Sequence, residues 1–442
     1  MISIDKFIAV FFSVLFPILQ PVLPETADSL AGTNIEKILF VGNKKTKDQI
    51  IRREMKSQEG MPYSPEILKK DIKRIESLRL FSRVQSDIFQ SAPDSLIIII
   101  TLSERWYIFP VPYLLRNEKS WDKWSYGLAL LHDNLHGLNH DLMASAWLGF
   151  NPGFDIEYNI PRFAPSLDLF AGFNVYSLLI KSQNLYPNSD LGYTRYDFNE
   201  QHKGFKGYLG KRWGYHFYTS VLFSYNHLDY PDTFQYLLSQ PGSQRTASIG
   251  ADFRWDTRDL IQYPTSGCYF DTYIAYTPWD QVNYTYIGTD LRTFFEWHNL
   301  TLAARLAGKK SLGHVPIFAR TFLGYEERIR GHFTKRLEGE NRAIASAEIR
   351  FPIIPVHYIN LEDPDEYLGH YSKDLPLGLN GSVFYDTGSV WMQNEQPSDS
   401  KILSGFGIGL HARVPYAEVI RFEYAFDSQW RSEWIIDLEV SF

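Results

Sequence analysis

The clearest pattern in the chain is an alternation of apolar and polar residues that recurs through its C-terminal three quarters. In residues 247–256 the odd positions are Ala, Ile, Ala, Phe and Trp, whereas the even positions are Ser, Gly, Asp, Arg and Asp. The same two-residue period returns in residues 406–414 and 436–442. Because successive side chains of a strand point to opposite faces, these segments predict strands with one apolar face and one polar face.

The polar faces indicate which side of the predicted sheet meets solvent. A soluble sandwich could alternate too, but its outward face would be polar and its core would not hold Arg254, Arg413 and Asp437 in rows. A transmembrane barrel has the reverse order, with polar residues inside and apolar residues outside. Residues 105–442 would allow sixteen strands of about 21 residues each, enough for a spanning segment and a turn. We therefore expect a mainly β fold, a sixteen-stranded antiparallel transmembrane β-barrel over residues 105–442.

Composition agrees with this fold class. The chain contains 28 Tyr, 31 Phe and 11 Trp, and barrels use aromatic residues at both membrane interfaces. The net charge is −7 without a basic stripe, so no nucleic-acid partner is expected. The single cysteine, Cys268, excludes an intramolecular disulfide framework and any multi-cysteine metal site.

The N-terminus has the features of an export signal. Lys6 precedes an apolar stretch at residues 7–16, and small residues follow near Ala27. We expect residues 1–28 to be a signal peptide, and an uncleaved signal anchor is the alternative.

Residues 35–104 have a different pattern, which predicts a small domain of order β-α-α-β-β. Alternation predicts a strand at residues 35–41, and residues 84–90 and 96–102 form a predicted hairpin. Thr46 and Gln49 have the spacing of a capping box for a first helix that extends to about residue 56.

Ser64 and Pro65 mark the start of the second helix in this segment. Serine is favoured as an N-cap, and proline is favoured at the first helical position. In its order and spacing, the whole of residues 35–104 resembles a POTRA domain, a periplasmic module. Such a module could bind an extended client by adding a strand to its sheet edge.

Three further patterns resemble the BamA/TamA superfamily, also called the bacterial surface antigen family. Residues 133–137 resemble a turn between two early strands. Residues 256–259, followed by 264–267, resemble the turn between the eighth and ninth strands. Residues 324–332 contain Arg330-Gly331 and resemble the inward-folded loop that follows the eleventh strand in this family, with Ile329 and His332 in place of its valine and aromatic residue.

The resemblance also implies carboxylate partners for that arginine, and alternation tests them. On the strand containing Glu348 the odd positions are apolar, so Glu348 points into the lumen. On the strand containing Asp386 the same argument places Asp386 inside, close to Gly388. We hypothesise a contact between Arg330 and Asp386 with Glu348 nearby, so that the loop is anchored within the barrel. Gly331 and Gly388 complete this expected loop anchor.

The resemblance further implies a weak seam between the first and last strands. Pro110 and Pro112 would remove backbone donors from the first strand. Trp434 and Phe442 lie on the last strand, and alternation assigns Phe442 to its lipid-facing row together with Ile436.

The expected function is assembly, insertion or translocation of proteins at the bacterial outer membrane, with the N-terminal domain in the periplasm and without enzymatic activity. The expected partners are outer-membrane lipid, an unfolded or extended client bound by the periplasmic domain, and accessory assembly proteins. A passive or ligand-specific pore is one alternative, and a surface-exposed structural or adhesive barrel acting through loops such as residues 181–199 is another. No cofactor or metal is expected, because the evenly spaced His132, His136 and His140 fall on strands and a turn instead of one helix face.

Overall fold

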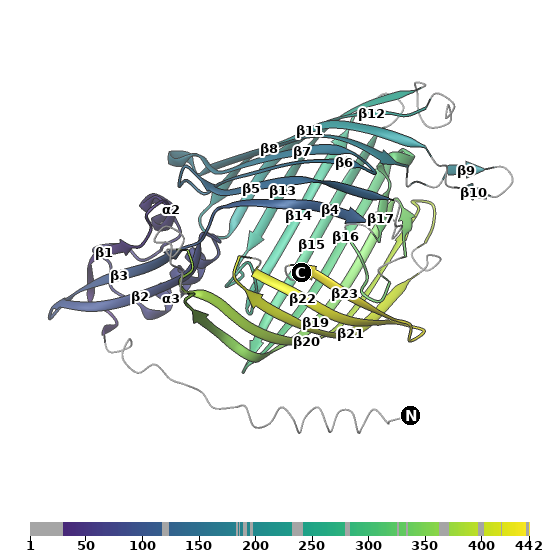
Figure 1. Cartoon of the computed structure of the whole chain (residues 1–442). Helices are drawn as coiled ribbons and strands as arrows, with labels where there is room; N and C mark the ends of the chain where they lie inside the picture. Colours follow the sequence, from purple (N-terminus) through teal and green to yellow (C-terminus); the bar gives the residue numbers. More distant parts are fainter. Residues whose placement is uncertain are drawn as a thin grey trace, which may run out of the picture.

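The computed structural model describes a small N-terminal domain at one end of a large curved sheet (Figure 1). The residues expected to form a signal peptide, 1–28, lie outside the described part of the chain. The described residues are 30–116, 123–182, 184, 186–188, 192–194, 198–231, 242–278, 283–324, 327–332, 335–361, 371–396, 402–416, 418–438 and 442.

The N-terminal domain has the predicted β-α-α-β-β order. Its sheet has the order β1-β3-β2, in which β3 pairs parallel with β1 and antiparallel with β2. One face of this sheet and the two helices enclose a core that includes Ile35, Ile51, Ile75 and Ile98. No helix in the described part of the chain is long and apolar enough to cross a membrane. The elements are β1 (Asn34–Val41), α2 (Asp48–Arg53), α3 (Pro65–Glu76), β2 (Phe81–Ala92) and β3 (Ser95–Glu104).

The two helix starts differ from each other. Ser64 caps α3 as predicted, because its hydroxyl accepts from the backbone N–H of Ile67 at 3.4 Å. The predicted capping box is wrong, since α2 begins after Lys47 without a side-chain cap. The hydroxyl of Thr46 instead lies 3.1 Å from the hydroxyl of Tyr107 and accepts from the Asn134 side chain at 2.9 Å. A tertiary contact with the barrel therefore replaces the local cap.

Sixteen antiparallel strands form the large sheet, the predicted number, in the order β23-β22-β21-β20-β19-β16-β15-β14-β13-β12-β11-β8-β7-β6-β5-β4. Two short hairpins, β9–β10 and β17–β18, lie in connections between strands. The strands of the large sheet are β4 (Ile108–Arg116), β5 (Trp124–Leu135), β6 (His140–Gly149), β7 (Gly153–Ala164), β8 (Leu169–Lys181), β11 (Asn199–Trp213), β12 (Phe217–Asp229), β13 (Ser243–Asp256), β14 (Gly267–Thr277), β15 (Tyr284–Trp297), β16 (Leu300–Gly313), β19 (Asn341–Ile359), β20 (Leu375–Trp391), β21 (Leu403–Val414), β22 (Glu418–Asp427) and β23 (Ser432–Leu438). The connecting elements are η4 (Pro165–Leu167), β9 (Tyr186–Asn188), β10 (Gly192–Thr194), η5 (Ile317–Ala319), β17 (Thr321–Leu323) and β18 (Leu337–Gly339).

The two faces of the sheet have the polarity that alternation predicted. Large apolar side chains such as Ile249, Leu306 and Ile408 are more than half exposed and cover the outer surface. Charged side chains such as Glu348 and Glu423 are buried on the inner face. The motif at residues 256–267 connects β13 to β14, the eighth and ninth strands of the sheet, as its pattern predicted.

The first and last strands of the sheet, β4 and β23, are its two ends. Within the described part of the chain no backbone ladder joins these strands. Side chains meet near the periplasmic end of this seam, where the Arg105 guanidinium donates to the carbonyl of Tyr416 at 2.9 Å. The ring of Phe109 also lies 5.9 Å from that of Tyr416. These contacts join the start of β4 to the turn between β21 and β22, beside the seam.

Phe442 does not occupy the predicted position on the lipid-facing row of the last strand. Its side chain is 2% exposed and packs inside the barrel against Phe294 and Ala303, which are inward-facing residues of β15 and β16. The guanidinium carbon of Arg350 lies 5.6 Å from its ring centroid. An apolar and cationic pocket in the lumen thus holds the aromatic ring, whereas Trp434 remains outside and 77% exposed.

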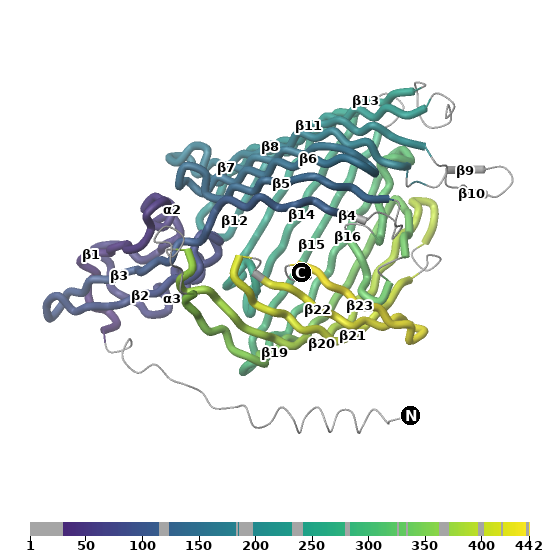
Figure 2. Tube along the Cα trace, viewed as in Figure 1, coloured from purple at the N-terminus to yellow at the C-terminus, as the bar shows by residue number. Residues whose placement is uncertain are grey.

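The N-terminal domain lies against the periplasmic turns of the barrel, as the tube trace also indicates (Figure 2). The carboxylate of Glu54 accepts two bonds from Arg212 at 2.5 and 2.7 Å. At another part of the rim, Asp374 accepts from Arg83 at 3.0 Å and from Ser103 at 2.6 Å. These contacts, which lie far apart on the rim, fix the orientation of the domain.

Candidate functional site

A long connection between β16 and β19, the eleventh and twelfth strands, folds into the lumen. It contains η5, the β17–β18 hairpin and the described tip at residues 327–332. Gly324 allows the sharp turn before the tip, because its φ is +117° and a side chain there would overlap the carbonyl of Lys335. The motif at residues 324–332 is therefore located where its pattern predicted.

The tip of this loop has its own small apolar core. Ile329, at the position that resembles the family's valine, is 1% exposed and packs with Leu323 of the same loop. The barrel wall contributes Ile344, Val390 and Leu403 to this cluster. Burial of these side chains stabilises the inward-folded loop against the wall formed by β19, β20 and β21.

Arg330 follows this apolar core and is 4% exposed. Its guanidinium donates to both carboxylate oxygens of Asp386, at 2.7 and 2.9 Å. The remaining terminal nitrogen donates at 2.8 Å to both Glu348 and Glu423. The hypothesised contact with Asp386 is thus present, Glu348 is adjacent, and Glu423 is a third partner that was not predicted.

Two more arginines balance the charge of these carboxylates. Arg350 donates to Glu348 at 2.6 Å, and Arg421 donates to Glu423 at 2.8 Å. Three buried guanidinium groups therefore face three buried carboxylates. Each carboxylate is paired with a cation, which lowers the free-energy cost of burial. We call Arg330, Glu348, Arg350, Asp386, Arg421 and Glu423 the lumenal charge cluster.

Glycines allow the loop backbone to approach the barrel wall. A side chain on Gly405 would overlap the carbonyl oxygen of Arg330, and a Cβ on Gly388 would lie 2.9 Å from Ile329. Gly331 has a φ of +91°, and its N–H donates to Glu433 at 2.8 Å. Of the two predicted anchor glycines, Gly331 is therefore part of the loop, and Gly388 lies on the barrel wall next to the loop residue Ile329. The run of glycines on β21 was a sequence signal for this close approach.

A second ion-pair group anchors the loop and was not predicted. Arg305 of β16 donates to both carboxylate oxygens of Glu327, at 2.7 and 3.0 Å, and to Asp290 of β15 at 2.8 Å. Alternation places Arg305 and Asp290 inside the barrel, but the loop residue Glu327 has no periodic pattern that would identify its partner.

Two carboxylates of the lumenal charge cluster, together with the neighbouring His411, have the composition of a metal site. One possible ligand atom from each of Glu348, His411 and Glu423 lies within 4.8 Å of the others. However, Glu348 accepts from two arginines, and so does Glu423. A cation would have to displace these guanidinium groups, so the cluster fits an internal anchor better than a metal centre.

The predicted seam residues divide between two locations. Pro110 and Pro112 lie on β4 opposite Leu130 and Leu128 of β5. Proline has no backbone N–H and is found mainly on edge strands, so each of the two prolines removes one donor from β4. Trp434 lies on β23, and only Phe442 has left the seam for the lumen.

Comparison with family models matches two segments of the chain. The Omp85 superfamily domain model matches residues 134–433. The POTRA model, described as a surface antigen variable number repeat, matches residues 33–105.

Two curated relatives carry the name outer membrane protein assembly factor BamA. The protein from Nitratidesulfovibrio vulgaris is 22% identical over 412 residues, which cover 89% of this chain and 48% of that protein. The protein from Neisseria meningitidis serogroup B is 36% identical over 73 residues, which cover 16% of this chain and 9% of that protein. The chain thus spans about half the length of the first and a small part of the second.

Two solved structures share the fold. CdiB from Escherichia coli has a TM-score of 0.58 at 13% identity, covering 95% of this chain and 78% of that chain. BamA from Haemophilus ducreyi lacking POTRA domains 1–3 has a TM-score of 0.51 at 18% identity, covering 92% of this chain and 83% of that chain. At these identities the likeness concerns the fold alone.

Proposed function

The chain belongs to the Omp85 superfamily of outer-membrane β-barrels, and on this premise we propose that it inserts extended protein clients into the outer membrane or passes them across it. The proposal includes a non-enzymatic mechanism, in which binding and strand exchange replace chemistry. It also includes delivery of the client by the periplasmic POTRA domain and cooperation with accessory assembly proteins. The name of the curated relatives, outer membrane protein assembly factor, supports insertion of clients into the membrane as one part of this proposal.

The observation that carries the proposal is the seam between β4 and β23. Within the described residues no ladder joins these strands, and Pro110 and Pro112 reduce the donors that β4 can offer. An unpaired strand edge presents backbone groups that a client strand can bind. The seam therefore supports a lateral opening through which a client hairpin would pass into the bilayer.

The lumen supports the same proposal over a passive pore. The loop that carries Arg330 lies inside the barrel, where its ion pairs are buried. Removing it from the lumen would break several charge-assisted bonds at once. A freely open channel would require that loss, whereas lateral opening at β4 and β23 leaves the lumenal charge cluster intact.

The POTRA domain offers an edge for an extended client. Strands β1 and β2 are the edges of its sheet, and β2 has twelve residues. Phe89 on β2 is 55% exposed and Val41 at the end of β1 is 51% exposed. Addition of a client strand to either edge would supply main-chain hydrogen bonds, with these apolar side chains available for contact.

A reversible disulfide across the seam tests the proposal. In a Cys268→Ser background, Val111→Cys on β4 is combined in turn with cysteine at Glu433, Ile435 and Asp437 on β23, and the pair that oxidises most completely is selected. The protein is reconstituted in liposomes with a urea-unfolded small outer-membrane barrel as the client. Insertion is measured by protease protection. We expect oxidation to abolish insertion and reduction to restore it.

The matched control joins two strands that are already paired. Ala129 of β5 and Ser145 of β6 are direct partners in the ladder, so a disulfide between them does not close a seam. This control should leave insertion unchanged. Full insertion by the oxidised seam variant would contradict lateral opening, and a steady ion conductance through the oxidised protein would favour the pore.

A further inference from the structure

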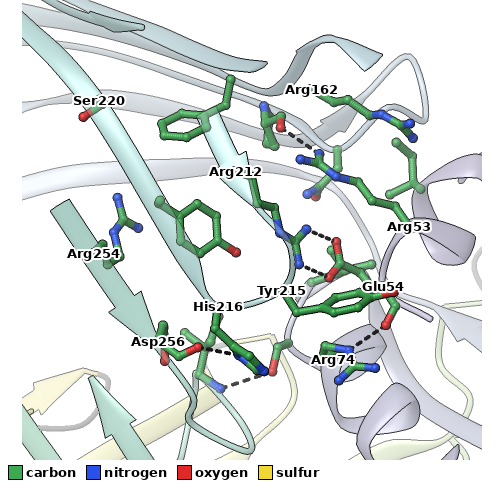
Figure 3. A pocket seen from close by; sticks show the side chains of 18 of the residues that line it. Arg53, Glu54, Arg74, Arg162, Arg212, Tyr215, His216, Ser220, Arg254 and Asp256 are labelled. Atoms are coloured by element: carbon green, nitrogen blue, oxygen red, sulfur yellow. Dashed lines mark hydrogen bonds and ion pairs between the residues drawn. The ribbon is translucent and has the colours of Figure 1, made fainter. Parts of the chain in front are cut away.

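A cavity of 490 Å³ lies between the POTRA domain and the periplasmic part of the barrel lumen (Figure 3). Helices α2 and α3 line one side, through residues such as Arg53 and Arg74. Strands β11, β12 and β13 line the other side, through residues such as Tyr208, Tyr218 and Arg254. The volume is within the range of about 300–1,000 Å³ that small-molecule sites occupy.

Six arginines line this cavity, and three of them are paired closely with a carboxylate. Arg212 is bound by Glu54, as described above, and Arg258 donates to both oxygens of Asp256 at 2.7 and 2.9 Å. Arg74 is paired with Asp71 of the same helix. The lining arginines are Arg53, Arg74, Arg162, Arg212, Arg254 and Arg258.

Two of the remaining arginines form a cationic corner with Arg212. Arg53 donates to the carbonyl of Pro161 at 2.8 Å and lies 3.8 Å from the carboxylate of the half-exposed Asp168. Arg162 donates to the carbonyl of Gln49 at 3.3 Å. Arg254, at the other end of the cavity, lies 3.6 Å from Asp271 and is balanced by it. Positive charge is therefore concentrated where α2 meets the ends of β7 and β11.

Unpaired hydrogen-bond donors and the pKa of Arg53 both agree with a concentration of positive charge at this corner. The Nε atoms of Arg53, Arg162 and Arg212 are buried and have no hydrogen-bond acceptor within the described residues. Burial, followed by the positive charges of Arg212 and Arg162, lowers the pKa of the Arg53 guanidinium despite the opposing effect of Glu54. Buried Nε–H groups without an acceptor, on guanidiniums of which Arg212 is buried and Arg53 and Arg162 are partly buried, form a favourable environment for an anion.

We propose that the corner formed by Arg53, Arg162 and Arg212 binds an oxyanion of the phosphate type. The unpaired Nε groups of three guanidiniums on three elements can donate to several oxygens of one tetrahedral anion, while the terminal nitrogens of Arg212 stay bound to Glu54. The phosphate could be free or part of a lipid headgroup, and the chemistry of recognition is the same.

This site would also connect the two parts of the chain. Arg53 belongs to the POTRA domain, whereas Arg162 and Arg212 belong to the barrel. A bound phosphate would therefore favour the arrangement in which the domain lies over the periplasmic turns. Binding does not depend on the proposed insertion function, so either proposal can fail without the other.

Isothermal titration calorimetry of the full chain in dodecyl maltoside tests the site. Inorganic phosphate and dihexanoyl phosphatidylglycerol are titrated separately, with chloride at equal ionic strength as the reference. We expect saturable binding of at least one of the two phosphate ligands, and the tighter one identifies the source. Arg162→Gln should weaken that binding about tenfold, since a lost charge-assisted bond has roughly that effect. Arg162→Lys, which retains the charge and loses the forked donors, should weaken it less.

The matched control is Arg292→Gln, which removes a lumenal arginine that does not line the cavity. It should bind as tightly as the unaltered protein, and heat-modifiable electrophoresis checks that every variant is folded. Absence of binding by both phosphate ligands would overturn the proposal. Unchanged affinity in a folded Arg162→Gln variant together with an Arg53→Gln variant would overturn it as well, because the site would lie elsewhere.

Discussion

The hydroxyl of Tyr263 lies 3.1 Å from Nδ1 of His411, and both side chains are buried, although five strands of the sheet separate the elements that carry them. Tyr263 belongs to the turn between β13 and β14, and His411 belongs to β21. In the same turn, Gln262 donates to the carbonyl of Glu76 in the POTRA domain at 2.9 Å. One turn thus contacts the POTRA domain and the inner face of a distant barrel wall.

His411 extends this connection toward the loop anchor. Its Nε2 lies 3.1 Å from the hydroxyl of Ser382 and 3.8 Å from the carboxylate of Glu423, which binds Arg330. We expect Tyr263→Phe to lower the free energy of unfolding by about 1–3 kcal/mol, because a buried group loses its partner. Hydrogen exchange should also become faster at residues 327–332.

The control for that change is Tyr158→Phe, which removes a similar tyrosine–histidine contact. The hydroxyl of Tyr158 lies 2.9 Å from Nδ1 of His140, on strands distant from the loop. Exchange at residues 327–332 should be unchanged in this variant. Equal acceleration in both variants would indicate general loosening of the barrel instead of a connection through Tyr263.

Removal of the Arg330 guanidinium should be severe. Arg330→Ala leaves three buried carboxylates without a shared cation, and breaking a buried pair costs about 3–5 kcal/mol. Arg330→Lys should recover part of this lost stability, because it retains the positive charge. The recovery should be incomplete, because an ammonium group cannot form the bidentate contact with Asp386. Urea unfolding followed by heat-modifiable electrophoresis measures both. Arg292→Ala, whose partner Asp290 retains Arg305, should change stability by less than about 1 kcal/mol.

Gly405 should not tolerate a side chain. The methyl group of Gly405→Ala would overlap sterically with the carbonyl oxygen of Arg330, a backbone atom that cannot rotate away as a side chain could. We expect displacement of the loop, with faster hydrogen exchange at its tip and a loss of stability of about 1–3 kcal/mol from overpacking. Gly308→Ala on β16 is the control, since its nearest neighbour would be 3.5 Å away. If Gly405→Ala behaves like Gly308→Ala, the loop does not lie against β21.

The bidentate pair of Glu54 and Arg212 should hold the POTRA domain in place. Spin labels at the exposed positions Lys70 and Asn299, in a Cys268→Ser background, report the distance between domain and barrel. We expect either Glu54→Arg or Arg212→Glu to broaden the distance distribution, because like charges then meet in a buried site. The double exchange should narrow it again. A narrow distribution in both single variants would show that the other rim contacts suffice.

Stability should depend on pH through Glu76. Burial, together with the charge of Asp259, raises the pKa of the Glu76 carboxyl above its ordinary value of 4.5, against the opposing effects of Lys73 and Arg413. The folded state therefore binds this proton more tightly, so its contribution to stability is present below pH 4.5 and is lost as pH rises through the raised pKa.

Glu76→Gln should accordingly increase the urea midpoint at pH 8 and flatten the dependence above pH 4.5. Glu66→Gln is the control and should instead decrease the urea midpoint at pH 8. The hydroxyl of Ser64 lowers the pKa of the Glu66 carboxyl, so the ionised form of Glu66 favours the folded state. A decrease in stability at pH 8 on Glu76→Gln would contradict the raised pKa.

Much of the barrel could be predicted because its determinants are local. The two-residue period assigns each strand residue to one face, so the lumenal positions of Glu348 and Asp386 followed from neighbouring residues alone. On β22 the same period, in which Phe422 and Tyr424 flank Glu423, indicates that Glu423 points inside, but it does not give the depth at which Glu423 meets Arg330. That depth depends on the register of strands far apart in the chain.

The failures share one physical cause. Thr46 and Gln49 have the sequence spacing of a capping box, yet the Thr46 hydroxyl contacts Tyr107 and Asn134 in a buried tertiary contact that replaces the local cap. Phe442 continues the apolar row of the last strand in sequence, yet the lumen offers Phe294 and Arg350 as partners. In both cases a non-local contact competes with the local pattern.

The sequence by itself indicated the strands and the face occupied by most of their side chains, since these depend on periodicity, while chain length was compatible with sixteen strands. The loop that carries Arg330 was located by its resemblance to a family motif. Only the tertiary structure decided which lumenal charges meet, that Tyr263 reaches His411, that Phe442 turns inward, and that Arg53 meets Arg162 and Arg212 in one cavity. Curvature of the sheet around a lumen and packing of the POTRA domain against its rim bring together residues whose spacing along the chain gives no indication of contact.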